Sequence, residues 1–190
     1  MKVEILLEAG YAPAMLGLSL NKLKDPANMP AVARRLAGKD QGHDKFLRMI
    51  DIWLDVTAPR FFWAEMDQYK IGRNQLPDGD EGDIITESAS TMNNIKDRDL
   101  TNEDFEYILW SPYLRWLNSV LAAVRSDIVP LDEFKSELPE GYLQRRILKI
   151  NYAVAYDIIA TRSTHRLPQW HVFCEVLRGL EHAELLEVRK

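Results

Sequence analysis

The sequence predicts a single α+β domain, residues 1–190, with few strands and much helix. Residues 49–56 alternate between apolar and polar side chains, which is the period of a half-buried strand. Residues 142–161 instead repeat apolar side chains at helical spacing. The length of 190 residues suits one domain with a substantial core, and no internal repeat or low-complexity tract suggests a further unit.

The composition is that of a folded globular protein, with 46% hydrophobic and 28% charged residues. The net charge of -5 opposes a general nucleic-acid surface. Cys174 is alone, which excludes an internal disulfide, and no apolar run reaches the roughly 18 residues that span a bilayer. Glu4 and Glu8 interrupt the first segment, unlike a signal peptide. We therefore expect a cytoplasmic protein with neither a nucleic-acid nor a membrane partner.

Before the first long alternating run, the sequence predicts one strand and one clear helix. Val3, Ile5 and Leu7 alternate with more polar neighbours, which indicates a strand that ends near Gly10 and precedes a short helical segment. Residues 29–37 carry a proline in a first helical turn and are followed by a glycine, which is typical of a complete helix.

A further helix is expected directly after the strand at 49–56. Thr57 is suited to accept backbone N–H bonds as an N-cap, and Pro59 fits a first helical turn. Gly72 is a natural C-terminal stop. These signals predict a helix from 57 to 72.

Residues 75–86 are predicted to form an inserted acidic surface loop, because they combine glycines, a proline and four acidic side chains. Asp78, Asp80 and Asp83 suggest calcium, but the twelve-residue calcium-binding pattern is absent. A solvated loop is therefore favoured over a calcium site.

The chain after Thr101 is predicted to be helical almost to its end. Thr101 with Asp104 is typical of a capped helix start, and leucines recur at helical spacing from Ser111 onward. Two prolines, Pro130 and Pro139, indicate further boundaries. Residues 142–161 form the longest predicted helix.

Common catalytic and metal-binding patterns are missing. The spacing of His165, His171, Cys174 and His182 matches no standard zinc pattern, so surface or capping histidines are favoured. Ser88 and Ser90 lack the G-x-S-x-G elbow of a serine nucleophile, and no glycine-rich phosphate loop occurs.

Residues 42–72 carry a resemblance to a known family. The segment begins with Gly-His, continues through an apolar turn and an alternating strand, and ends in the helix EMDQYK. This order resembles the core of the flavin-dependent thymidylate synthases, in which a GH-x-S histidine and a strand precede QLVRHR and the signature RHRxxSxNExSxRY. His43 matches the family histidine and Glu65 stands at the glutamine. Gln68, Tyr69 and Lys70 replace Arg-His-Arg.

The later part of the signature matches only weakly. In TESASTM, residues 86–92, either Ser88 or Ser90 corresponds to the signature serine, but no arginine or tyrosine follows. A second segment keeps the family order, with a leucine-proline pair, an asparagine, an arginine and a glutamine in the closing helix. These are Leu138 with Pro139, Asn151, Arg162 and Gln169, and Ala153 stands where the family has a further arginine.

The resemblance implies a helix-rich α+β fold with a small antiparallel sheet, and a homotetramer with sites between subunits. It also implies a flavin, FAD, and a nucleotide, deoxyuridine monophosphate (dUMP), which is methylated from a folate. Residues expected to hold cofactor and nucleotide are His43, Lys70, Arg73, Ser88, Ser90, Asn151 and Arg162.

The departures from the signature argue against standard catalysis. An arginine binds a phosphate or a uracil edge with two donors, whereas Gln68 is neutral. Losing one such donor costs about 100 to 1000 fold in rate. We therefore expect a protein that binds a nucleotide or flavin with little or no dUMP methylation. The alternatives are an active methylating enzyme with a rearranged site, and a non-catalytic scaffold that sequesters a nucleotide or contacts another protein.

Overall fold

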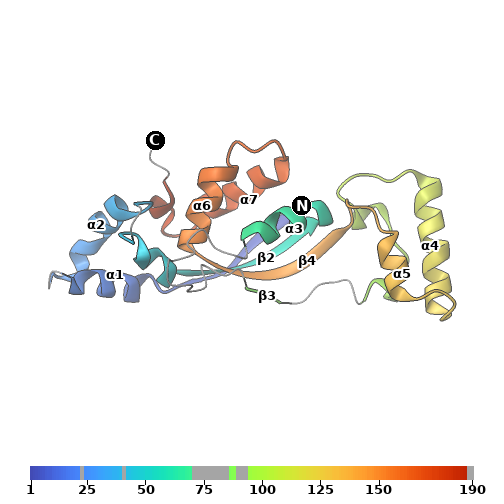
Figure 1. The fold of residues 1–190 in the computed structure, drawn as a ribbon, viewed down its shortest axis with the longest axis horizontal. Helices are drawn as coiled ribbons and strands as arrows, with labels where there is room; N and C mark the ends of the chain where they lie inside the picture. Colours follow the sequence, from blue (N-terminus) through green and yellow to red (C-terminus); the bar gives the residue numbers. More distant parts are fainter. Residues whose placement is uncertain (22–23, 40–41, 70–85, 89–93, 188–190) are drawn as a thin grey trace.

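A four-stranded antiparallel sheet with strand order β1-β2-β4-β3 forms the middle of the molecule (Figure 1). The computed structural model describes the whole chain except residues 22–23, 40–41, 70–85, 89–93 and 188–190. Its strands are β1 (Lys2–Ala9), β2 (Asp51–Pro59), β3 (Thr86–Ser88) and β4 (Leu143–Asn151). The predicted α+β class with a small antiparallel sheet is confirmed.

Strand β2 is the central strand that the alternation predicts. Ile52, Leu54 and Val56 are fully buried, and β2 pairs with β1 on one side and β4 on the other. The strand runs three residues further than expected, because Thr57 pairs with Arg145 of β4 and the ladder continues to Pro59. The predicted helix start at Thr57 is therefore wrong.

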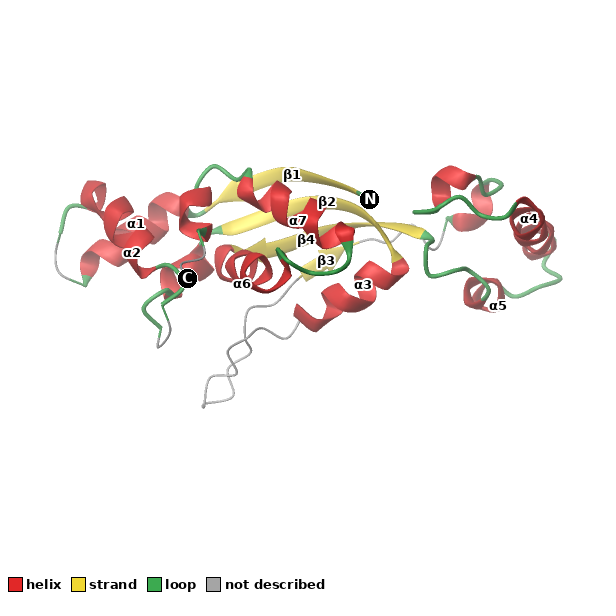
Figure 2. Ribbon diagram, turned by 90° about the horizontal axis from the view of Figure 1, so that it is seen from above, coloured by secondary structure: helices red, strands yellow, loops and turns green. Residues whose placement is uncertain are grey.

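Three helices cover one face of the sheet: α3 (Arg60–Met66), α6 (Tyr152–Arg162) and α7 (Pro168–Arg178) (Figures 1 and 2). Phe62 and Trp63 of α3 are both buried, and the ring of Phe62 packs against Trp170 and Phe173 of α7, with centroids 4.6 Å and 5.9 Å away. The indole N–H of Trp63 donates to the backbone carbonyl of Ala58, at 3.0 Å, and so ties α3 to the end of β2.

The long helix predicted over residues 142–161 is wrong in its first half. Residues 143–151 form β4, and only residues 152–162 are helical. Leu148 and Ile150 face the buried side with the period of a strand. A short apolar run fits both periods, and pairing along the whole of β2 selects the strand. Asn151 then caps α6, because its side chain accepts from the Val154 backbone N–H at 3.0 Å.

Residues 94–142, here called the arm, project from one end of the sheet and have a buried cluster of their own (Figure 2). The arm contains α4 (Ser111–Arg125) and α5 (Leu131–Ser136). The leucine spacing in α4 is confirmed, and Pro130 directly precedes α5 as predicted. Thr101 and Asp104 form the predicted capping box, but around a single 3-10 turn, Asn102–Asp104.

The opposite end of the sheet carries α1 (Tyr11–Leu20) and α2 (Met29–Leu36), which confirm the two helices expected there. Gly10 joins β1 to α1 with a φ of 100°, and an added Cβ would lie 2.0 Å from the carbonyl oxygen of Met49. Only glycine fits this junction. Short 3-10 turns occur at Pro26–Asn28, Lys45–Met49, Asp67–Tyr69, Ile95–Asp97 and Ala183–Leu186.

Some predicted features fall on undescribed residues. The predicted acidic loop and its calcium hypothesis concern residues 75–85, which lie outside the described part, while Thr86 begins β3. The helix stop predicted at Gly72 also lies outside it; α3 ends at Met66 and continues as the 3-10 turn Asp67–Tyr69. None of the described helices has the length and apolar character that crossing a membrane requires.

Replacing Asp104 with asparagine is expected to lower the free energy of unfolding by about 0.5–1 kcal/mol at neutral pH, because the amide keeps an acceptor for the Thr101 N–H but removes the charge opposite Arg98. The pKa of Asp104 lies below its usual 3.8: burial raises it, but hydrogen bonds from Arg98 and the Thr101 backbone outweigh burial. A carboxyl with a lowered folded pKa stabilises the fold above its unfolded pKa, and this stability is lost as pH falls through the folded value. Unfolding measured at pH 7 and below pH 3.8 should therefore show a smaller difference between variant and wild type in acid.

Asp99→Asn is the matched control. Asp99 also pairs with an arginine, Arg125, at 2.7 Å, but its side chain is 68% exposed. Ion pairs exposed to solvent contribute little to the free energy of unfolding. Two results would contradict a stabilising role for the Asp104 carboxylate. One is an equal loss of unfolding free energy in both variants, and the other is an Asp104→Asn loss that is as large in acid as at pH 7.

Candidate functional site

Arg162, at the end of α6, is the centre of a polar cluster on the helical side of the sheet. Its Nε donates to the hydroxyl of Tyr69 at 2.8 Å. Its two terminal nitrogens donate to Glu65 Oε2 and Gln68 Oε1, each at 3.2 Å. The guanidinium also lies over the ring of Trp170, 4.8 Å from the centroid. We call these five residues the Arg162 network.

Three separate elements supply the Arg162 network. Glu65 is near the end of α3, and Gln68 and Tyr69 belong to the 3-10 turn Asp67–Tyr69 that continues it. Trp170 lies in the first turn of α7. Arg162 itself occupies the last turn of α6, where the helix dipole favours a cation.

The charges of the Arg162 network compensate one another. Glu65 Oε2 accepts from Arg162 and from the indole N–H of Trp170, at 2.8 Å, and His165 Nε2 lies 3.7 Å away. The side chains of Arg162 and Glu65 are only 15% and 24% exposed, so solvent screens this pair less than a surface pair. Three of the five guanidinium N–H donors are therefore engaged within the protein.

The other predicted binding residues do not gather around Arg162. Asn151 is the N-cap at the opposite end of α6, roughly 16 Å away along an eleven-residue helix. His43 lies in an exposed turn, and among the described residues no hydrogen bond or ion pair joins it to Arg162. Ser88 pairs with Ile147 at the edge of the sheet. Lys70, Arg73 and Ser90 lie outside the described residues.

Two hollows lie elsewhere on the molecule. One, of about 280 Å³, separates the start of β4 from residues 94–104 of the arm. The other, of about 720 Å³, lies between α6 and residues 183–187. Neither is lined by a predicted site residue. These two hollows and the family resemblance therefore indicate different places, and the chemistry of Arg162 favours the Arg162 network.

The hollow beside the arm has two arginines in its lining, and each is paired with a carboxylate of the same chain. Arg98 pairs with Asp104 and Arg145 pairs with Asp55. The hydrogen bond from Arg145 holds the pKa of Asp55 below its usual value. Burial raises the pKa of Tyr142, which also lines the hollow, to about 12. Both arginines are thus committed to carboxylates of the same chain.

The histidine and cysteine residues weighed as a zinc site do not form one in the described part of the chain. Cys174 is fully buried in α7, and burial raises the pKa of its thiol to about 11. His171 is exposed and contacts the backbone of His165. His182 instead faces two glutamates, Glu8 and Glu181.

Comparison with solved structures identifies the fold. A crystal structure of the flavin-dependent thymidylate synthase ThyX from Helicobacter pylori, complexed with FAD and dUMP, matches with a TM-score of 0.74 over 98% of both chains. The chain has the ThyX fold. A second ThyX structure from Helicobacter pylori, with FAD and dUMP, matches with a TM-score of 0.73 over 98% of this chain and 97% of the other. Sequence identity is 13% in both cases, and no family model and no curated protein matches the sequence.

Sequence reasoning missed part of the Arg162 network. It singled out Arg162, and it placed Glu65, Gln68 and Tyr69 only as replacements of the family motif. The ThyX fold brings all of them together, and it adds Trp170 of α7, which donates to Glu65 of α3. The position of Trp170 directly after the matched Gln169 was the available signal.

Replacing Glu65 with glutamine is expected to destabilise the protein by about 1 kcal/mol, because the amide keeps an acceptor for Trp170 but removes the charge opposite Arg162. Urea unfolding measures the change. Glu140→Gln is the control, since Glu140 also pairs with an arginine, Arg60 at 3.5 Å, but is 63% exposed. If both variants were as stable as the wild type, the Arg162–Glu65 pair would not brace α3 against α6.

Proposed function

We propose that the protein binds a phosphorylated nucleotide or a flavin at the end of α6 and has little or no dUMP-methylating activity. Support for the binding comes from the ThyX fold, whose solved examples hold FAD and dUMP. Support for weak activity comes from the Arg162 network. A fold by itself does not establish a reaction, whereas the side chains at the end of α6 determine which charges the site can hold.

The observation that carries the proposal is the local charge. In the described residues, Arg162 is the cation of the network and Glu65 its counter-charge, so the pair is neutral overall. Gln68 and Tyr69 are uncharged, and they occupy the place of two members of the Arg-His-Arg motif. A phosphate or an activated uracil is anionic and requires cationic donors. A neutral site of this kind binds such groups weakly and stabilises developing charge poorly.

Arg162 can still contribute to ligand binding. It keeps two N–H donors beyond those engaged by Glu65, Gln68 and Tyr69. Tyr69, which is half-buried, lies beside it with an aromatic ring that suits a planar base or an isoalloxazine, whereas Trp170 is fully buried and only supports Arg162. Lys70 and Arg73 follow Tyr69 in the sequence, and we propose them as the cations at the mouth of this site. His43, Ser88, Ser90 and Asn151 are proposed to contact other parts of a large ligand such as FAD.

Titration with FAD and with dUMP by calorimetry tests the binding. Arg162→Ala is expected to weaken the affinity about tenfold or more, because a charge-assisted hydrogen bond contributes about 1.5–3 kcal/mol. Glu65→Gln is expected to strengthen it, since the substitution removes the competing carboxylate. The double variant Lys70→Ala with Arg73→Ala should weaken it as well. Circular dichroism of each variant controls for folding.

Two results would overturn the proposal. Release of tritium from labelled dUMP at an ordinary turnover, on the order of 10 per second, would establish the alternative of an active enzyme with a rearranged site. Failure of both ligands to bind the folded wild type would leave the scaffold alternative.

Exposed apolar side chains on the arm, most of them aromatic, support a homo-oligomer, with a tetramer favoured. Tyr107, Ile108 and Trp110 are 63%, 84% and 75% exposed and precede α4, which adds Trp116 at 44%. Aromatic residues are enriched at the centres of protein interfaces. A contact surface for another protein, as in the scaffold alternative, would use the same residues.

Light scattering at micromolar concentration is expected to give a mass of roughly four times 22.0 kDa. Trp110→Ser should shift the protein toward smaller species, because it removes a large apolar contact. Ile128→Ser is a control of equal exposure, 75%, in the turn after α4. A strict monomer in the wild type would refute the oligomer.

A further inference from the structure

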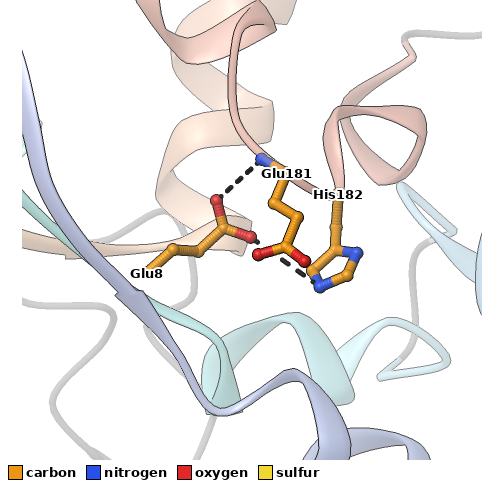
Figure 3. A group of neighbouring side chains, drawn as sticks. All are labelled: Glu8, Glu181 and His182. Atoms are coloured by element: carbon orange, nitrogen blue, oxygen red, sulfur yellow. Dashed lines mark hydrogen bonds and ion pairs between the residues drawn. The ribbon is translucent and has the colours of Figure 1, made fainter.

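Three side chains from distant parts of the sequence converge between β1 and the segment after α7 (Figure 3). Glu8 comes from β1, and Glu181 and His182 follow the end of α7. One carboxylate oxygen of each glutamate and one imidazole nitrogen all lie within 4.8 Å of one another. His182 Nε2 is 3.9 Å from Glu8 Oε1.

Existing contacts hold two of the three side chains in place. Glu8 Oε1 accepts from the Tyr152 hydroxyl at 2.7 Å, and Glu8 Oε2 accepts from the Glu181 backbone N–H at 3.0 Å. Each carboxylate oxygen keeps a lone pair beyond these bonds. The ring of Tyr11 stacks on His182, with centroids 3.4 Å apart and planes at 15°. Such supporting contacts orient ligands in metal sites.

The third side chain adds uncompensated charge. Within the described part of the chain, the Glu181 carboxylate forms no hydrogen bond or ion pair, and its side chain is exposed. It nevertheless lies beside the Glu8 carboxylate, whose side chain is only 10% exposed (Figure 3). Two adjacent carboxylates repel each other unless a cation lies between them. A divalent cation between the two carboxylates would offset this repulsion.

We propose that Glu8, Glu181 and His182 bind a divalent transition metal ion of the zinc class. One imidazole nitrogen with two carboxylate oxygens is a donor set that suits such ions, whereas calcium and magnesium prefer oxygen ligands alone. Ligand atoms on a tetrahedral zinc ion lie about 3.4 Å apart. The 3.9 Å between His182 Nε2 and Glu8 Oε1 is close to this spacing.

The bound ion would fasten the C-terminal segment to the first strand. Glu8 and Glu181 are separated by 173 positions in the sequence, and a metal bond between them closes nearly the whole chain. The site shares no residue with the Arg162 network. The test of the metal site is therefore separate from the test of nucleotide or flavin binding.

Calorimetric titration of the chelator-treated protein with zinc chloride tests this site. We expect one equivalent to bind, and cobalt to give the visible absorption bands of a low-symmetry site. Glu181→Gln should weaken binding at least about tenfold while leaving the fold intact, because this side chain is exposed. Tyr152→Phe, which removes only the hydroxyl that supports Glu8, should weaken it about 10 to 100 fold.

His171→Gln is the control for metal capture by an ordinary exposed histidine, and it should leave the affinity unchanged. Zinc that binds the Glu181→Gln protein as tightly as the wild type would overturn the assignment. The absence of a stoichiometric zinc site in the folded wild type would also overturn it. Glu8 would then have only a structural role, as the acceptor of the Glu181 backbone N–H. Preferential binding of magnesium or calcium would refute the zinc-class donor set.

Discussion

The antiparallel pairing of β2 with β4 fixes where everything else in the molecule lies. The two strands pair over nine positions each, from Asp51 opposite Asn151 to Pro59 opposite Leu143. Each strand is followed immediately by a helix, α3 after Pro59 and α6 after Asn151. Since the strands are antiparallel, the two helices start at opposite ends of the sheet and run toward each other over the same face.

The lengths of these elements make the helix ends meet. A nine-residue strand spans roughly 30 Å. The turns from Arg60 to Tyr69 cover about 14 Å and α6 about 16 Å, so that together they cover the length of the strand. Glu65 and Tyr69 therefore come against Arg162, although the sequence separates them by more than ninety positions. Trp63, bonded to the carbonyls of Ala58 and Gln144, fixes the start of α3 to both strands.

This meeting point has opposite consequences for stability and for ligand binding. The contacts that brace α3, α6 and α7 also occupy the guanidinium of Arg162. Each internal bond lowers the capacity of that side chain to hold an anion, because a ligand must compete with a partner that is already in place. The ThyX fold is thus preserved while the electrostatics at the end of α6 are those of a structural ion pair.

The sequence by itself determined the elements whose signals are local. The alternation in β2, the proline and glycine boundaries of α2, the leucine spacing of α4 and the capping box at Thr101 all follow from neighbouring residues. The order of the weak family motifs was also sufficient to predict the fold, because it sums many positions.

Only the tertiary structure decided the features that depend on distant partners. Residues 143–151 fit a helical stripe, and only pairing with β2 makes them a strand. The engagement of Arg162 by Glu65 depends on where two helices end, and the meeting of Glu8 with His182 depends on the return of the chain to its first strand. Local propensity carries no information about such contacts, since the partners are brought together by the burial of the whole sheet face.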